Sequence, residues 1–112
     1  MRTRSQVLLW GAQRASAVVL ALCVLVHLAT IVYATRNGLS AAEILGRTRG
    51  SAMWFGFYML FVAAVAVHAP IGLRTIVSET TGWRGRTLDG CMLLVGLLLG
   101  LLGARAAWAV FA

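Results

Sequence analysis

Residues 50–73 read GSAMWFGFYMLFVAAVAVHAPIGL, and this stretch decides the fold class. It carries no formal charge between Arg49 and Arg74. Residues 15–35 are equally neutral, and residues 90–112 contain a single arginine near their end. Each stretch is long enough to cross the roughly 30 Å hydrocarbon core of a bilayer, which needs about 20 helical residues. Because lipid offers no hydrogen bonds to the backbone, the sequence predicts an all-α membrane protein with three transmembrane helices.

The predicted helices cover approximately residues 15–35, 51–76 and 90–112, within a single transmembrane domain of residues 1–112. The composition agrees with this prediction, because 61% of the residues are hydrophobic and 12% are charged. Soluble domains are closer to half apolar and a quarter charged, and disordered chains are more polar still. The first span is longer than the core of a signal peptide, about 7–15 residues, so we expect it to be retained.

All ten basic residues are arginines, and with three carboxylates they give a net charge of +7. They lie between the apolar stretches, which suits lipid headgroups and predicts no nucleic-acid partner. The N-terminal segment and the second loop carry three arginines each, whereas the first loop and the tail carry four in total. The positive-inside rule then predicts a cytoplasmic N-terminus and a periplasmic C-terminus. We expect a multi-pass protein of the inner (cytoplasmic) membrane.

Two histidines, His27 and His68, lie inside the predicted spans. Ionisable side chains are costly there and are usually functional. A neutral imidazole can simply hydrogen-bond a neighbouring helix, but it can also bind the iron of a b-type haem. His68 has small residues one turn away on either side, Ala64 and Gly72, which would leave a recess for a porphyrin face. The same small residues would also permit the close approach of another helix.

The first span carries a polar seam, because Ser16, Cys23, His27 and Thr30 fall within about 60° of one another on a helical wheel. We expect this seam to face protein or ligand, with Arg14 on the opposite side of the helix. His27 is a second candidate haem ligand. Counted along the spans, however, His27 and His68 lie roughly 12 Å and 25 Å from the outer surface. The second axial ligand is therefore expected from another chain.

The third span indicates packing, since Gly96, Gly100 and Gly103 permit close helix contact. The sequence shows no nucleophile–base pair, phosphate loop or metalloprotease motif, so we expect no catalysis by this chain alone. Two other classes of function are open at this point. Small multidrug-type transporters have a similar length, but they usually have four spans and a glutamate within the membrane. The other alternative is a haem-free structural membrane protein, whose histidines serve packing.

The run His68-Ala69-Pro70-Ile71-Gly72-Leu73-Arg74, followed by Glu79, resembles a signature of known membrane subunits. It is similar to the HxxxGxR…D/E motif of the cytochrome b membrane-anchor subunits of succinate dehydrogenase and fumarate reductase. The segment Arg14-Ala15-Ser16 is similar to the R-x-S element of the same family. The resemblance covers roughly residues 10–84 and leaves the third span matched by hydrophobicity alone.

The resemblance implies a three-helix anchor that holds haem b through His68, with Arg74 near the haem propionates. It also implies a quinone site near the cytoplasmic face, to which Arg14 and Ser16 contribute. The implied partners are the flavoprotein and iron–sulfur subunits of a succinate:quinone oxidoreductase-type complex. A second anchor chain, or a second copy of this chain, would complete the membrane part. In such a complex this chain is a non-catalytic electron-transfer subunit.

Overall fold

The computed structural model describes residues 2–112, which form four helices and contain no strand. The helices are α1 (Arg2–Arg36), α2 (Ala41–Thr48), α3 (Ala52–Thr81) and α4 (Arg86–Phe111). Helices α1, α3 and α4 are each long and apolar enough to cross a membrane. The prediction of an all-α protein with three membrane-spanning helices is therefore confirmed.

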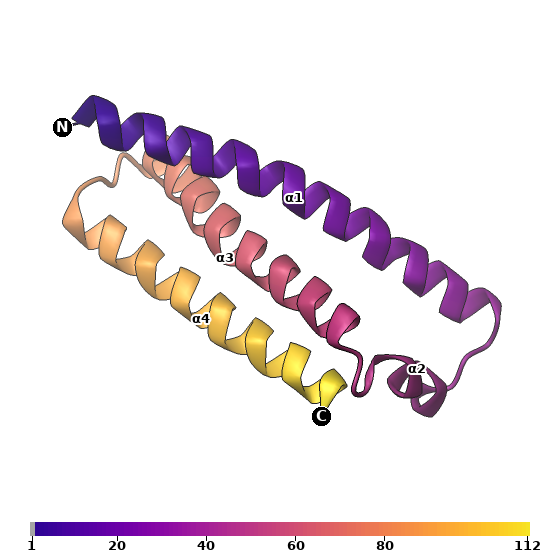
Figure 1. Ribbon diagram of the computed structural model, residues 1–112. Helices are drawn as coiled ribbons and strands as arrows, with labels where there is room; N and C mark the ends of the chain where they lie inside the picture. Colours follow the sequence, from indigo (N-terminus) through magenta and orange to yellow (C-terminus); the bar gives the residue numbers. More distant parts are fainter. Residues whose placement is uncertain (1) are drawn as a thin grey trace.

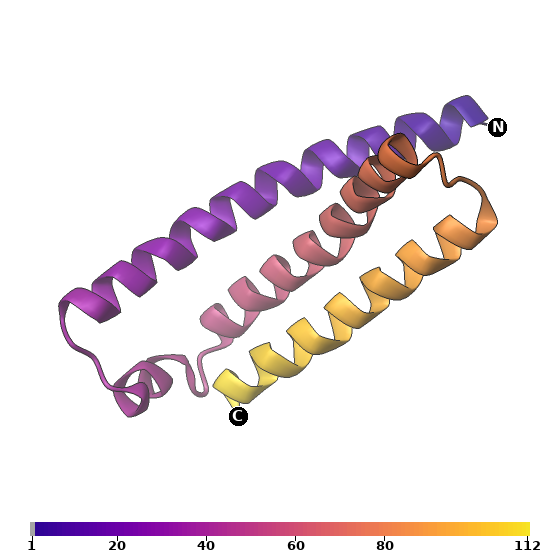
Figure 2. The same cartoon turned by 180° about the vertical axis from the view of Figure 1, so that it is seen from behind.

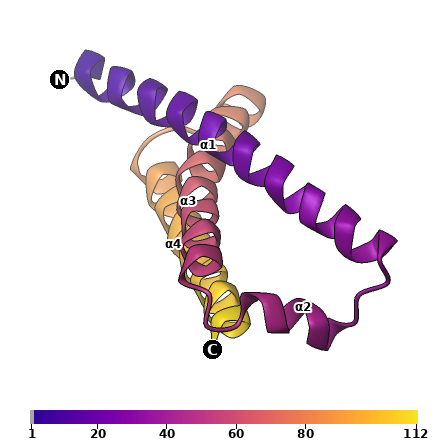
Figure 3. The ribbon, with the colours of Figure 1, turned by 45° about the vertical axis from the view of Figure 1, so that its right-hand side comes forward.

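Helix α3 lies between α1 and α4 and contacts both of them (Figure 1). Helices α3 and α4 are antiparallel and stay side by side over their length, as the view from behind also shows (Figure 2). Helix α1 instead crosses α3 and diverges from it toward α2 (Figure 3). The bundle is 50 Å long and 25 by 22 Å across. The two faces of α3 are thus packed in different ways.

The positions at which the helices begin and end depend on local sequence signals more than on where the charged residues lie. Helix α1 extends to Arg2, well before the neutral stretch, because arginine, glutamine and alanine are good helix formers. Helix α2 lies in a segment expected to be a loop, and it begins with a capping box. There the Glu43 amide donates to Ser40 Oγ at 3.2 Å, and the Ser40 amide donates to Glu43 Oε1 at 3.3 Å. The S-x-x-E pattern was the signal for this helix.

Helix α3 begins at an N-cap, where the Trp54 amide donates to Ser51 Oγ at 3.3 Å. It ends at Gly82, whose φ of 75° is a left-handed conformation that glycine adopts without strain. The helix continues past Pro70 and includes Arg74, beyond the end of the neutral stretch. It also carries Glu79, which comes to lie about 20° from His68 on the helical wheel.

Close glycine contacts join α3 to α4. Pro70 has no amide hydrogen to donate to the carbonyl of Ala66. A Cβ at Gly96 would lie 3.2 Å from that carbonyl oxygen and 3.1 Å from Cγ of Pro70. A Cβ at Gly103 would lie 2.7 Å from Cγ1 of Val62. The glycines therefore allow the close approach that their spacing indicated.

Polar contacts fix α4 at both of its ends. At its C-terminal end, Thr48 Oγ1 donates to the Val110 carbonyl at 2.8 Å, and the Gly50 amide donates to the Phe111 carbonyl at 2.9 Å. At its N-terminal end, Arg74 Nε donates to Asp89 Oδ1 at 2.6 Å. Large apolar side chains of α4, such as Leu93 and Leu101, remain exposed, as expected of surfaces that face lipid.

Candidate functional site

His68 lies on α3 with small residues one turn away on either side. Ala64 is buried, and Gly72 has no side chain. The His68 ring is half-buried, and its Nδ1 atom is buried without a hydrogen-bond partner in the part of the chain that the structure describes. A buried polar atom left without a partner costs about 1–3 kcal/mol. The His68 Nδ1 atom therefore lacks a compensating hydrogen bond within the described chain.

Gln13 of α1 occupies the recess beside Gly72. A Cβ at Gly72 would lie 3.0 Å from Gln13 Nε2, so the amide fills the space that the glycine leaves. The other amide atom, Gln13 Oε1, is buried and has no hydrogen-bond partner in the part of the chain whose side chains are described. Gln13 therefore covers Gly72 in this chain. The features beside His68 that fit a bound haem are the small side chain of Ala64 and the unpartnered acceptor Gln13 Oε1, which can take the proton on the second ring nitrogen of a ligating histidine.

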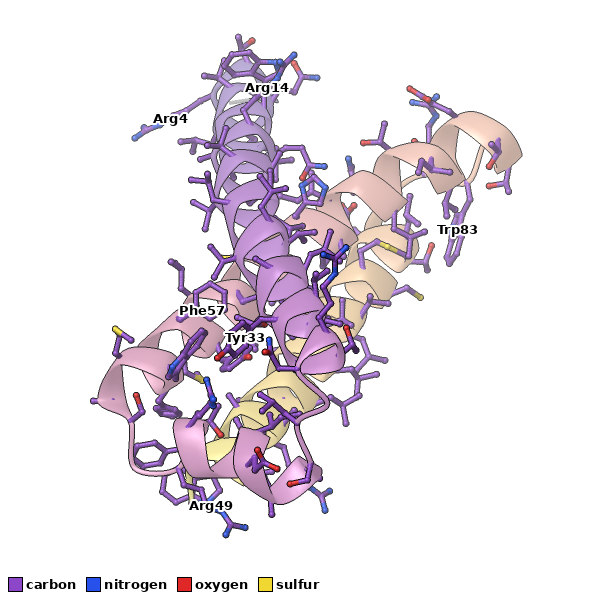
Figure 4. All side chains as sticks on the ribbon, turned by 90° about the vertical axis from the view of Figure 1, so that its right-hand side faces the viewer. Arg4, Arg14, Tyr33, Arg49, Phe57 and Trp83 are labelled. Carbon is purple, nitrogen blue, oxygen red and sulfur yellow. The ribbon has the colours of Figure 1, made fainter. Side chains whose placement is uncertain are left out.

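Arg14 and Ser16 lie on different sides of α1. Ser16 is 8% exposed, and its Oγ donates to the Gln13 carbonyl at 3.1 Å. Arg14 is exposed, with its guanidinium carbon 5.1 Å from the centre of the Trp10 ring. Figure 4 shows Arg14 near the end of α1 that is remote from α2. This chain alone does not bring Arg14 and Ser16 into one pocket.

Arg74 is paired with Asp89 in the first turn of α4, and both side chains are partly exposed. This is the one salt bridge among the side chains of residues 3–112. The sequence did not indicate the role of Asp89, because its partner lies on a different helix. Periodicity along one helix does not reveal contacts between two helices. Only Nε of Arg74 is engaged by Asp89, and the guanidinium has further N–H donors.

His27 lies farther along α1, against two aromatic rings of α3. Its ring centroid is 5.8 Å from that of Tyr58 and 5.7 Å from that of Phe61, both in edge-to-face geometry. Its Nδ1 is buried and lacks a hydrogen-bond partner in the described chain. Ser16 and Cys23 of the same seam are buried, and Thr30 Oγ1 donates to the His27 carbonyl at 2.6 Å. The polar seam faces protein, as expected.

The two histidines lie at different levels of the bundle. His27 contacts Tyr58 and Phe61, whereas His68 lies seven residues beyond Phe61 on the same helix. Seven to ten residues correspond to about 10–15 Å along a helix. The structure therefore does not bring the two imidazoles together. Among the side chains of residues 3–112, no group of three His, Cys, Asp or Glu could hold a metal ion.

Helices α1, α2 and α3 border an open cavity of about 600 Å³ at the end where α1 diverges from α3. Figure 4 shows Tyr33 and Phe57 from the two helices at this end of the bundle. The polar and aromatic side chains in its lining are those of His27, Thr30, Tyr33, Arg47, Thr48, Trp54 and Tyr58. The sequence did not indicate this cavity, because its walls come from three separate segments.

Comparison with known proteins gives one match. A family model described as the succinate dehydrogenase/fumarate reductase transmembrane subunit matches residues 1–104. The match extends through most of α4, beyond the segment that carries the sequence motifs. Searches of curated proteins and of solved structures returned no match. The match leaves no support for the transporter hypothesis. With its three apolar helices, the chain belongs to the succinate dehydrogenase/fumarate reductase transmembrane subunit family and is a multi-pass membrane-anchor subunit.

Proposed function

We propose that this chain holds haem b in a succinate:quinone oxidoreductase-type complex and that His68 is an axial ligand. The observation that carries the proposal is the His68 imidazole, whose buried Nδ1 has no partner in the described chain and whose helical neighbours are small. Histidine nitrogen is a usual ligand of haem iron. The haem, when bound, supplies one-electron transfer between the iron–sulfur subunit and the quinone.

Gln13 supports the ligand role of His68. A histidine that binds metal through one nitrogen usually donates the proton on the other to an acceptor. Gln13 Oε1 is a buried acceptor without a partner among residues 3–112, on the α1 side chain that lies against Gly72. Gly72 is one helical turn from His68. We propose that Gln13 Oε1 accepts the Nδ1 proton and thereby orients the ring.

The second axial ligand comes, in this proposal, from another chain. His27 is about 10–15 Å from the level of His68 along the bundle, so it does not serve the same iron. A second anchor subunit, or His68 of a second copy of this chain, supplies the ligand instead. Arg74 retains N–H donors for a haem propionate, with which guanidinium pairs well.

The quinone site is proposed at the same end of the bundle as His68, where α1 carries Arg14 and Ser16. Arg14 faces outward from this chain, so a neighbouring chain has to form the rest of the pocket. The N-terminus and the α3–α4 loop are proposed to be cytoplasmic, since the arginine counts favour this orientation. The flavoprotein and iron–sulfur subunits dock on that face of the inner membrane and deliver electrons to the quinone.

An absorption spectrum of the purified complex tests the haem assignment. We expect a reduced b-type band that disappears in His68→Ala and persists in the matched control His27→Ala. Copurification of the flavoprotein and iron–sulfur subunits is followed in parallel, so that loss of haem is distinguished from loss of assembly. Full haem content in His68→Ala would remove the ligand assignment. A colourless wild-type complex with an active dehydrogenase would identify a haem-free structural anchor instead.

A further inference from the structure

We propose that the cavity between α1, α2 and α3 binds one anionic phospholipid, with the phosphate at Arg47 and an acyl chain between α1 and α3. This site lies at the opposite end of the bundle from Arg14 and Arg74, and His68 does not line it. It does not depend on the haem or on the quinone.

The cavity is built by the divergence of α1 from α3, and α2 lies across its end (Figure 3). Its volume of about 600 Å³ falls in the usual range of small-molecule sites, about 300–1,000 Å³. Aliphatic side chains of α1, including Val26 and Ile31, and the rings of Trp54 and Tyr58 form much of the wall. Such a wall favours a hydrocarbon chain.

A single cation lines this cavity. The guanidinium carbon of Arg47 lies 5.2 Å from the centre of the Tyr33 ring, and both residues line the cavity. Arg47 has no carboxylate within ion-pair distance in the described chain, where the one salt bridge joins Arg74 to Asp89. Glu43 lies one turn before Arg47 on α2, but its carboxylate caps the helix at Ser40. An anion from outside the chain can therefore pair with Arg47.

The position of α2 favours a lipid as the source of this anion. Helix α2 connects the ends of two membrane-spanning helices, which is the level of the headgroups. The segment from Arg36 to Arg49 carries three arginines and one carboxylate. Guanidinium binds phosphate through two parallel hydrogen bonds, and basic residues near a membrane surface attract anionic lipids. A lipid joins this phosphate to an acyl chain that the apolar wall accepts.

Quenching of tryptophan fluorescence by brominated lipids tests the site in the purified complex. Phosphatidylglycerol and phosphatidylcholine with brominated acyl chains are added separately to the complex in detergent. The contribution of Trp54 is the difference between the wild type and Trp54→Phe. We expect phosphatidylglycerol to quench Trp54 at a severalfold lower concentration than phosphatidylcholine. Arg47→Gln should abolish this preference, whereas Arg49→Gln, at the C-cap of α2 and outside the cavity lining, should retain it.

Three results would overturn the proposal. Equal quenching by the two lipids would exclude an anionic site, and an unchanged preference in Arg47→Gln would exclude Arg47 as the phosphate ligand. No quenching of Trp54 by either lipid would mean that a neighbouring protein chain covers the cavity. If Trp54→Phe fails to assemble, mass spectrometry of lipid bound to the wild-type, Arg47→Gln and Arg49→Gln complexes replaces the difference measurement. We expect the wild-type and Arg49→Gln complexes to retain phosphatidylglycerol and the Arg47→Gln complex to lose it.

Discussion

The two faces of α3 are packed in different ways. Against α4, glycines bring the backbones together at Gly96 and Gly103, and a salt bridge joins the helices at one end. Against α1, two imidazole nitrogens and an amide oxygen are buried without partners in the described chain, and the helices diverge around a cavity. Native proteins satisfy nearly all buried polar groups. The face toward α4 therefore has the closer helix packing, and the face toward α1 is where we propose that ligands bind.

The largest expected effect comes from filling the recess on the α1 face. In Gly72→Leu a branched side chain occupies the surface beside His68, so we expect the complex to lose most of its haem. Helix α3 should still form, because leucine favours helix and the Gln13 side chain can move aside. The measurement is the haem-to-protein ratio of the purified complex. The control is Gly56→Leu on the same helix, where a Cβ meets nothing within 4 Å.

A full haem complement in Gly72→Leu would show that the α1 face of α3 does not receive the porphyrin. Loss of haem in Gly56→Leu as well would indicate a general effect of bulk on α3 and would leave Gly72 without a special role.

A substitution on the α4 face should lower the stability of the complex and should not change its ligand content. In Gly96→Val the new side chain meets the Pro70 ring and the Ala66 carbonyl, neither of which can rotate away. Overpacking of this kind costs about 1–3 kcal/mol. Thermal unfolding of the complex in detergent, followed by circular dichroism, should show the loss. Gly100→Ala is the control, because its Cβ would lie 3.9 Å from that of Ala66, an ordinary contact. Equal stability of the two variants would contradict the close packing.

A smaller effect is expected at the end of the α1 face, where α2 borders the cavity. Ser40→Ala removes the N-cap of α2, which typically costs about 1 kcal/mol. The amides of α2 should then exchange with solvent roughly fivefold faster, since a kilocalorie corresponds to about that factor. Hydrogen exchange with mass spectrometry measures this directly. Ser51→Ala, which removes the cap of α3, serves as the control and should leave the exchange of α2 unchanged.

The smallest effect is expected from the salt bridge on the α4 face. Arg74 and Asp89 are 43% and 54% exposed, and exposed ion pairs contribute about 0.2–1 kcal/mol. A double-mutant cycle with Arg74→Gln and Asp89→Asn should give a coupling energy in that range. The coupling should fall as salt is added, because salt screens exposed charges. A coupling well above this range, or one insensitive to salt, would show that the pair is a main support of the fold.

Much of the architecture could be predicted from the sequence. Three neutral stretches predicted three membrane-spanning helices, and the run from His68 to Arg74 indicated the family that the match over residues 1–104 supports. Helix α2 was missed although the Ser40–Glu43 capping box was visible, because its segment was judged only by its charges. Gln13 and Asp89 could not be found in this way. Their roles depend on which side chain of another helix they face.

The sequence by itself determined that the chain crosses a membrane three times and where its two imidazoles lie along the helices. Both follow from local properties, since insertion into lipid depends on the hydrophobicity and length of each segment. The tertiary structure alone decided that α1 diverges from α3, that Gln13 fills the recess at Gly72, and that Arg47 borders a cavity. Helix crossing and contact depend on the shapes of two surfaces at once, which no single segment encodes.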